Sequence, residues 1–350
     1  MTNLFRSANA KSTYKKYGST FREYSQWALH NGVARGGYLL KPTEAELMLF
    51  AERLSRRMGG AAVGTAMSGL SACFLEAGIA NVTTTENGKI RPMLKKVLTG
   101  IKRKLKSKRA VERRALTVDK LRRCSPHIRQ AVRSDYDAVC YTAILSTGVY
   151  GMLRVGEMTS PKIHEHDPET KLNVEGVTFG PLGAGGVPEY AGVLIKMSKT
   201  GQEAEGITIR LFANGGRACA VYWLWRWCGI RKPSGPKAPL FVLQDGSYVT
   251  RGRLQRVIKS AVQGAGYDAT HFNTHSMRKG GATSLSCANW PKETIQMLGR
   301  WSSDCYLKYL QMNDARRKEV ALSLAKVTTE LLSAEQARGK VDANGFLVGG

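Results

Sequence analysis

The stretch HSMRKGGATSLSCANWPKETIQMLGRWSSDCYLKYL, residues 275–310, concentrates several reactive side chains in one short part of the chain. It begins with a histidine three residues before an arginine, continues to an adjacent Arg-Trp pair, and ends with Tyr306 and Tyr309. On a helix that begins near Ser302 or Ser303, two tyrosines three residues apart lie on neighbouring faces, so only one hydroxyl can point at a given target. The stretch therefore predicts half of a catalytic site with a single attacking tyrosine.

The composition of the chain indicates the kind of partner. The 350 residues are 43% hydrophobic, which is enough for two ordinary domains that each have a core. Lys and Arg number 53 against 27 Asp and Glu, so the net charge is 53 − 27 = +26, and the pI is about 10.0. A charge of this size favours polyanions, of which nucleic acid is the commonest.

A membrane is the rival anionic partner, and the sequence argues against it. The most apolar run, residues 61–80, is rich in Gly and Ala and carries Glu76, and no uninterrupted apolar stretch is long enough to span a bilayer. The first residues, MTNLFRSANAKSTYKKY, lack the apolar segment of a signal peptide. We therefore expect an intracellular protein that does not act at a membrane.

Motifs for metals and nucleotides are absent from the sequence. The seven cysteines are scattered and form no CxxC pair, so we expect reduced thiols and no zinc site. His271 and His275 have the spacing of a zinc helix but lack both the glutamate of a metalloprotease and a third ligand. The phosphate-loop pattern GxxxxGK[ST] is also missing. We expect neither a metal nor a small-molecule cofactor, and no use of ATP.

Periodicity predicts a helical first part of the chain. Apolar residues recur at helical spacing over 11–30, 43–57 and 61–77. Thr43 is placed to cap the second of these helices, with Glu46 completing a capping box. The residues up to 105 are therefore expected to form an all-helical domain.

The second part of the chain mixes helices with short β-branched segments. Thr117 is expected to open a helix, and residues 135–150 read as a largely buried one. Further helical patterns start at Ala218 and cover 251–263, while three strands are expected at 173–179, 191–197 and 206–212. The predicted fold is mainly α with a small antiparallel β-sheet, and Lys199 lies at or near the tip of the hairpin between the last two strands.

Residues 89–123 are strongly basic, with fifteen Lys or Arg against two acids. The middle of this segment shows no apolar periodicity that would bury it, so it reads either as a linker along a phosphate backbone or as a solvated charged surface. With the net charge of +26, we favour DNA contact. The candidate DNA-binding residues are Lys102, Arg103, Lys104, Lys106, Lys108 and Arg109.

Arginine, lysine, histidine and tyrosine together suit one reaction, the cleavage of a phosphodiester without a metal. The transition state carries extra negative charge on two non-bridging oxygens, which two fixed arginines can stabilise. A tyrosine with a pKa of about 10 needs a nearby base or cations to attack at neutral pH, and histidine is a suitable base. A lysine on a hairpin tip can protonate the leaving 5′-oxygen, and a covalent phosphotyrosine conserves the bond energy without ATP.

Five short motifs occur in an order that resembles the tyrosine recombinase or phage-integrase family. They are GVYGMLRVGEM (148–158), SKTG (198–201), HSMR (275–278), LGRW (298–301) and YLKY (306–309). The words HSMRKGGAT and LGRWSSDCYLKYL are most similar to recombinases of eukaryotic mobile elements, the DIRS-type retrotransposons and the cryptons. The resemblance implies a helical core-binding (SAM-like) domain and a catalytic domain that close on DNA as a C-shaped clamp.

The same resemblance assigns a role to each motif residue. It implies clamp arginines at Arg154 and Arg278, a supporting Glu157, a general acid at Lys199, a general base at His275, a phosphate-binding Trp301 and a nucleophile at Tyr309. The family usually has His or Trp directly after the motif glycine and nine residues before the tyrosine. Here that position is Arg300, and Trp301 is eight residues before Tyr309, so either residue could fill the role. Tyr306 is too early in the chain to reach the phosphate and is assigned to packing.

The expected organisation follows from these assignments. It comprises a core-binding domain over 1–105, a basic linker over 106–116, a catalytic domain over 117–330 and a tail over 331–350. The expected activity is site-specific recombination or integration of double-stranded DNA through a covalent 3′-phosphotyrosine, by a homotetramer that is nuclear if the host is eukaryotic. A type IB topoisomerase-like enzyme and an inactive DNA-binding regulator with the same fold are the alternatives.

Overall fold

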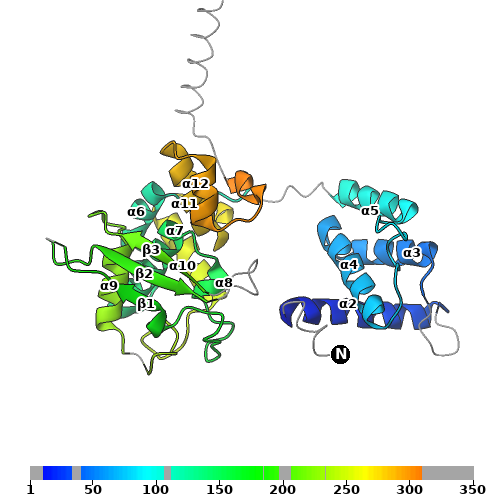
Figure 1. Cartoon of the computed structure of the whole chain (residues 1–350), viewed down its shortest axis with the longest axis horizontal. Helices are drawn as coiled ribbons and strands as arrows, with labels where there is room; N and C mark the ends of the chain where they lie inside the picture. The colour runs from blue at the N-terminus through cyan, green and yellow to red at the C-terminus, as the bar shows by residue number, and fades with distance from the viewer. Residues whose placement is uncertain are drawn as a thin grey trace, which may run out of the picture. The chain divides into compact units, whose positions relative to one another are not determined.

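The computed structural model describes residues 11–33, 41–105, 112–183, 185–196, 206–232 and 234–309. The chain divides into two compact units, Met1–Ala110 and Val111–Gly350 (Figure 1). No helix within the described ranges is both long enough and apolar enough to cross a membrane.

Unit 1 is helical around an aromatic core. Its described helices are α2 (Lys11–His30), α3 (Glu44–Ser55), α4 (Gly60–Glu76) and α5 (Pro92–Lys104). Tyr24 is central, with its ring 5.1 Å from that of Phe50 and 5.7 Å from that of Phe74, both edge-on. Such edge-to-face pairs stabilise a core beyond the area that they bury. The three helices expected in this part of the sequence are confirmed.

The predicted capping box at the start of α3 is also confirmed. The Glu46 backbone N–H donates to Thr43 Oγ1 at 3.3 Å, and the Thr43 N–H donates to Glu46 Oε2 at 2.7 Å. Two N–H groups that have no partner within the helix are thereby satisfied.

Helix α5 was not predicted, because its sequence was interpreted as part of a basic segment. Leu94 and Ile101, seven residues apart, are buried against the other helices, whereas Lys102, Arg103 and Lys104 are exposed in its last turn. Two buried side chains are enough to hold this basic helix on the core. Lys106, Lys108 and Arg109 lie outside the described residues.

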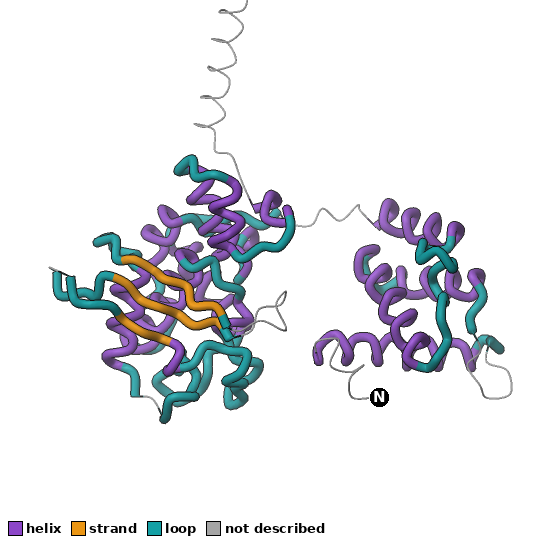
Figure 2. The backbone as a smooth tube through the Cα atoms, viewed as in Figure 1, coloured by secondary structure: helices purple, strands orange, loops and turns teal. Residues whose placement is uncertain are grey.

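Unit 2 combines seven α-helices and short 3-10 turns with one small sheet, among the residues that the structure describes (Figure 2). The helices are α6 (Val118–Cys124), α7 (Asp135–Tyr150), α8 (Val155–Met158), α9 (Ala220–Ile230), α10 (Arg251–Gly264), α11 (His275–Cys287) and α12 (Lys292–Gly299). Helix α7 lies in the core and buries every residue from 139 to 149, as its apolar sequence predicted. The predicted fold class, mainly α with a small antiparallel sheet, is confirmed.

The sheet has the strand order β1-β2-β3 and is antiparallel throughout. Its strands are β1 (Val177–Phe179), β2 (Tyr190–Ile195) and β3 (Ile207–Phe212), with Val193 opposite both Val177 and Ile209. The first strand is shorter than predicted, because residues 174–176 form a 3-10 turn. The hairpin between β2 and β3, with Lys199, lies outside the described residues.

The three tryptophans at the start of the second helical region have different surroundings. Trp227 is fully buried and donates from Nε1 to the Leu240 carbonyl at 2.8 Å, as expected for core packing. Trp223 is half-buried and donates to the Arg217 carbonyl, whereas Trp225 is 38% exposed. Trp225 therefore lies outside the core.

Residues 112–116, placed in the predicted linker, hydrogen-bond to the segment that opens α11. The Arg114 N–H donates to the His271 carbonyl at 2.8 Å, and the Leu116 N–H donates to the Ser276 carbonyl at 2.9 Å. This close approach needs a glycine at position 280, where a Cβ would lie 1.8 Å from the Leu116 carbonyl oxygen. The start of α11, which carries His275 and Arg278, is thus fixed from outside the helix.

We expect Gly280→Ala to destabilise the protein by about 1–3 kcal/mol, the usual cost of adding atoms to a tightly packed interior. Gly229→Ala in α9 is the matched control, since a Cβ there has nothing within 4 Å and alanine favours a helix. Urea unfolding of the two variants checks the expectation. Equal stability of both variants would show that the contact between Gly280 and Leu116 does not constrain α11.

Candidate active site

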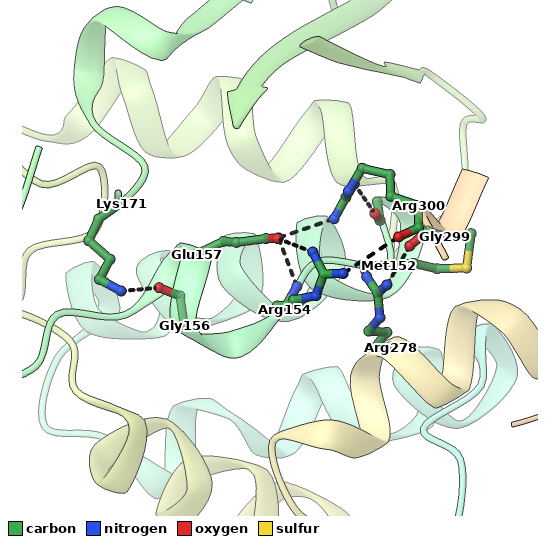
Figure 3. Close-up of polar contacts among 9 residues, drawn as sticks. Met152, Arg154, Gly156, Glu157, Lys171, Arg278, Gly299 and Arg300 are labelled. Carbon is green, nitrogen blue, oxygen red and sulfur yellow. Dashed lines mark hydrogen bonds and ion pairs between the residues drawn. The ribbon is translucent and has the colours of Figure 1, made fainter. Parts of the chain in front are cut away.

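Arg154 and Glu157 form a closed pair at the start of α8 (Figure 3). Arg154 is the N-cap residue, and its backbone N–H donates to Glu157 Oε2 at 2.8 Å. Its Nη1 donates to Glu157 Oε1 at 3.2 Å. The Glu157 side chain is only 6% exposed, against 23% for Arg154. The R-x-x-E motif is therefore a buried cap that orients a partly exposed arginine, rather than a surface ion pair.

Arg278 lies in the first turns of α11 and is almost completely buried. Its Nη1 donates to the Met152 carbonyl and its Nη2 to the Gly299 carbonyl. The Trp301 ring covers the guanidinium, with Cζ 4.3 Å from the ring centroid. Two carbonyls and one aromatic face therefore fix the plane of this guanidinium.

Arg300 is one of the two residues that the sequence left as candidates for the His/Trp position. It follows α12 in the left-handed conformation, with φ 55° and ψ 49°. Its side chain points into the protein, where Nη2 lies 3.1 Å from Glu157 Oε2 and Nη1 lies 3.4 Å from the Gly151 carbonyl oxygen. Burial lowers the pKa of the guanidinium, whereas Glu157 raises it; an arginine stays charged under these conditions. No sequence signal distinguishes this inward position from an exposed one.

Three arginines and one glutamate make the site strongly cationic. Arg154, Arg278 and Arg300 contribute +3 and Glu157 contributes −1, so the local charge is 3 − 1 = +2 (Figure 3). The arginines come from the starts of α8 and α11 and from the end of α12, which are far apart in the sequence. The structure thus brings the predicted pair of arginines into one cluster suited to an anion with several oxygens.

Two residues with positive φ supply carbonyls to this cluster. Met152, with φ 46°, precedes Arg154 by two residues and accepts from Arg278. Arg300, with φ 55°, accepts from Arg154 Nη2 at a long 3.5 Å. A left-handed non-glycine residue costs on the order of 1–3 kcal/mol and persists only where the surrounding structure enforces it. The strained turns therefore lie where the arginines need acceptors.

His275 is the first residue of α11 and is exposed beside the arginine cluster. Its backbone N–H donates to Asn273 Oδ1 at 2.9 Å, which fixes the helix start. Partial loss of its water shell, followed by the positive charges of Arg278, Arg251 and Lys279, lowers the pKa of the imidazole. His275 is therefore neutral near pH 7, the state in which an imidazole can accept a proton.

Trp301 and Tyr306 pack together in a small apolar cluster. Their rings stack with centroids 5.8 Å apart and an interplanar angle of 29°. The other buried members of the cluster are Met152, Ala282 and Ile295. Burial raises the pKa of the Tyr306 hydroxyl, and the nearby Asp304 and Glu293 raise it further. The prediction that Tyr306 serves packing is confirmed.

The segment that carries the predicted nucleophile is a 3-10 helix, η6 (Asp304–Tyr309), instead of the expected α-helix. Tyr309 is its last residue, and its side chain lies outside the part of the chain that the structure describes. The roles predicted for Tyr309, Lys199 and Trp301 stay predictions.

A comparison with protein-family models finds a match in the second half of the chain. Residues 186–316, which include α11, α12 and η6, match the model described as the phage integrase family. A comparison with curated protein sequences finds no significant match.

Solved structures of recombinases are similar to this chain in fold. XerH site-specific recombinase bound to palindromic difH substrate matches with a TM-score of 0.58 and 16% identity, over 89% of this chain and 78% of that chain. A lambda integrase dimer bound to a COC′ core site matches with a TM-score of 0.52 and 16% identity, over 87% and 72% of the two chains. The Tn1549 transposon integrase in complex with transposon right end DNA matches with a TM-score of 0.51 and 15% identity, over 89% and 99%. At these identities the likeness establishes the fold.

Among the described residues, no group of three or more His, Cys, Asp or Glu is arranged to hold a metal ion. The carboxylate in the arginine cluster is Glu157, and it is already bound to two arginines.

We expect an NMR titration of the six histidines to give His275 a pKa below the usual value of about 6.5. Because Arg251 is one of the cations that lower this pKa, Arg251→Gln should raise it, so that His275 is protonated at a higher pH than in the wild type. Arg226→Gln, which removes an exposed arginine of α9, is the control and should leave the titration unchanged. A wild-type pKa at or above 6.5 would contradict the expected neutral base.

Proposed function

We propose that the protein is a site-specific DNA recombinase or integrase that cuts and rejoins strands through a covalent 3′-phosphotyrosine on Tyr309. The observation that carries the proposal is the fixed arginine cluster. Arg154 and Arg278, which the motif order singled out, are held side by side through Glu157 and the backbone around Met152 and Gly299.

The proposed reaction uses this cluster to bind the scissile phosphate. The guanidinium groups stabilise the negative charge that develops on the non-bridging oxygens in the transition state. Neutral His275 accepts the proton of the Tyr309 hydroxyl as its oxygen attacks phosphorus, and the bond from phosphorus to the 5′-oxygen breaks. Lys199 gives a proton to that leaving oxygen. In the return step, a 5′-hydroxyl attacks the phosphotyrosine and frees Tyr309, so no nucleotide is consumed.

DNA binding by the rest of the chain is the second part of the proposal. The net charge of +26 and the exposed Lys102, Arg103 and Lys104 at the end of α5 suit phosphate contacts. Among the solved recombinases of similar fold, XerH is bound to palindromic difH substrate, lambda integrase to a COC′ core site and the Tn1549 integrase to transposon right end DNA. We propose that the two units close on DNA as a C-shaped clamp and that four copies assemble on the recombining sites.

The biological setting follows from the sequence resemblance. The words HSMRKGGAT and LGRWSSDCYLKYL suggest a mobile element of the DIRS or crypton type, which would place the protein inside the cell and in the nucleus of a eukaryotic host. In such an element, the DNA that flanks the coding sequence would contain the substrate site.

We expect nicked duplexes from this flanking DNA to trap a covalent adduct in the presence of EDTA and without nucleotide. Tyr309→Phe should bind the DNA but form no adduct, because the ring stays and only the attacking oxygen is lost. Tyr306→Phe, the matched control, should still form the adduct, since Tyr306 is buried in the Trp301 cluster. Mass spectrometry of the trapped peptide locates the phosphotyrosine.

An adduct on Tyr306 would overturn the assignment of the nucleophile. No adduct from the wild type on any flanking duplex would favour an inactive DNA-binding regulator. Adducts without strand exchange between two sites would favour a topoisomerase-like enzyme.

Lys199→Ala should reduce cleavage of an ordinary phosphodiester and recover it on a substrate with sulfur at the 5′-bridging position. A thiolate leaves without protonation, so the general acid is not needed for that substrate. His275→Ala is a useful comparison, because loss of a base is not repaired by a better leaving group. If the sulfur substrate fails to rescue Lys199→Ala, the acid is another residue.

A further inference from the structure

We propose that Arg300 is a positioning residue, which sets the orientation of Arg154 through Glu157 and does not bind the scissile phosphate itself. The inference rests on the proposed DNA cleavage. It concerns the position where the resembled family has a histidine or tryptophan, and it assigns the arginine found here a different task.

The burial of the two arginines separates their tasks. The Arg300 side chain is 8% exposed and Glu157 is 6% exposed, whereas Arg154 keeps 23% of its side-chain surface. The Arg300 guanidinium lies between Glu157 and the Gly151 carbonyl, so both of its Nη atoms face the protein interior. Arg154 is therefore the more accessible of the two arginines that bind Glu157.

Glu157 transmits the effect of Arg300 to Arg154. Its Oε2 accepts from Arg300 Nη2 at 3.1 Å and its Oε1 accepts from Arg154 Nη1 at 3.2 Å. Without Arg300, Arg154 and Glu157 would have a net charge of 1 − 1 = 0, and the carboxylate would be free to bind Arg154 with both oxygens. With Arg300, the three groups have a net charge of 2 − 1 = +1, and one carboxylate oxygen is already bound to Arg300.

The backbone of Arg300 adds a second constraint. Two consecutive carbonyls at the end of α12 each meet one clamp arginine, since Gly299 accepts from Arg278 and Arg300 accepts from Arg154. The left-handed conformation of Arg300 directs its carbonyl and its side chain toward the same cluster. Trp301, the next residue, covers Arg278. One turn therefore positions both arginines.

The test uses Arg300→Gly, because glycine adopts the left-handed conformation freely and keeps the carbonyl while it removes the side chain. At saturating DNA, we expect the single-turnover rate of adduct formation to fall by about 10- to 100-fold, the scale seen when groups that orient metal ligands are removed. The Kd for DNA should change by less than about twofold. Arg300→Lys, which keeps the charge beside Glu157, should restore part of the rate.

Asn289→Gly is the matched control for the backbone. Asn289 also has a positive φ, 62°, at the end of α11, and its replacement should leave the adduct rate unchanged. Thermal unfolding of each variant shows whether the fold is intact. Wild-type protein that forms no adduct would contradict the proposed cleavage, whereas active wild type with an undiminished Arg300→Gly variant would contradict this inference alone.

A double-mutant cycle distinguishes positioning from direct contact with phosphate. In a Glu157→Gln background, Arg300→Gly should cost little further rate, because the residue through which it acts is already changed. Independent losses that multiply would show that Arg300 contacts the phosphate directly. A crystal structure of Arg300→Gly needs no activity: we expect the Arg154 guanidinium to turn onto both oxygens of Glu157, and an unmoved Arg154 would overturn the proposal.

Discussion

The buried carboxylate of Glu157 is the interaction on which the site depends. A carboxylate out of water is costly unless several donors compensate for the lost solvation, and Glu157 has the Arg154 backbone N–H and two guanidinium groups. The arginines in turn would repel one another without this negative charge between them. Burial of the carboxylate and close approach of the arginines are each favourable only because the opposite charge is present. A strongly cationic site is therefore built around one fixed negative charge.

Backbone carbonyls accept the arginine N–H groups that the Glu157 carboxylate does not bind. Arginine carries five N–H donors, and the carbonyls of Gly151, Met152, Gly299 and Arg300 accept from those that face the interior. These carbonyls come from two turns, one after α7 and one after α12, and each turn contains a left-handed residue. Ordinary helix ends would direct these carbonyls along the helix axes. The departure from regular geometry thus provides the acceptors that orient the clamp.

The sequence predicted the parts of this arrangement that depend on local pattern. The capping box at Thr43, the buried α7 and the antiparallel strands follow from residue type and period, and the structure confirms them. The motif order singled out Arg154 and Arg278, which do meet. The sequence did not reveal the left-handed conformation of Arg300, on which its inward direction depends, because glycine usually occupies this position of a helix-ending turn. The turn is local, since the Arg300 N–H donates to the Met297 carbonyl and the Trp301 N–H to the Gln296 carbonyl. Helix α5 was not predicted because only Leu94 and Ile101 mark its buried face among many basic residues.

The packing around Trp301 links the clamp to the segment that carries the tyrosines. Trp301 has the Arg278 guanidinium near its ring and also stacks on Tyr306, within the cluster that includes Met152. Met152 belongs to the turn whose carbonyl binds Arg278. A shift of η6 would therefore disturb Trp301, and a shift of Trp301 would uncover Arg278. Because protein interiors repack in discrete arrangements instead of deforming smoothly, the start of η6 and the arginine plane are set together. Only two residues separate Tyr306 from Tyr309, so the chain reaches the predicted nucleophile directly from the packing that orients the clamp.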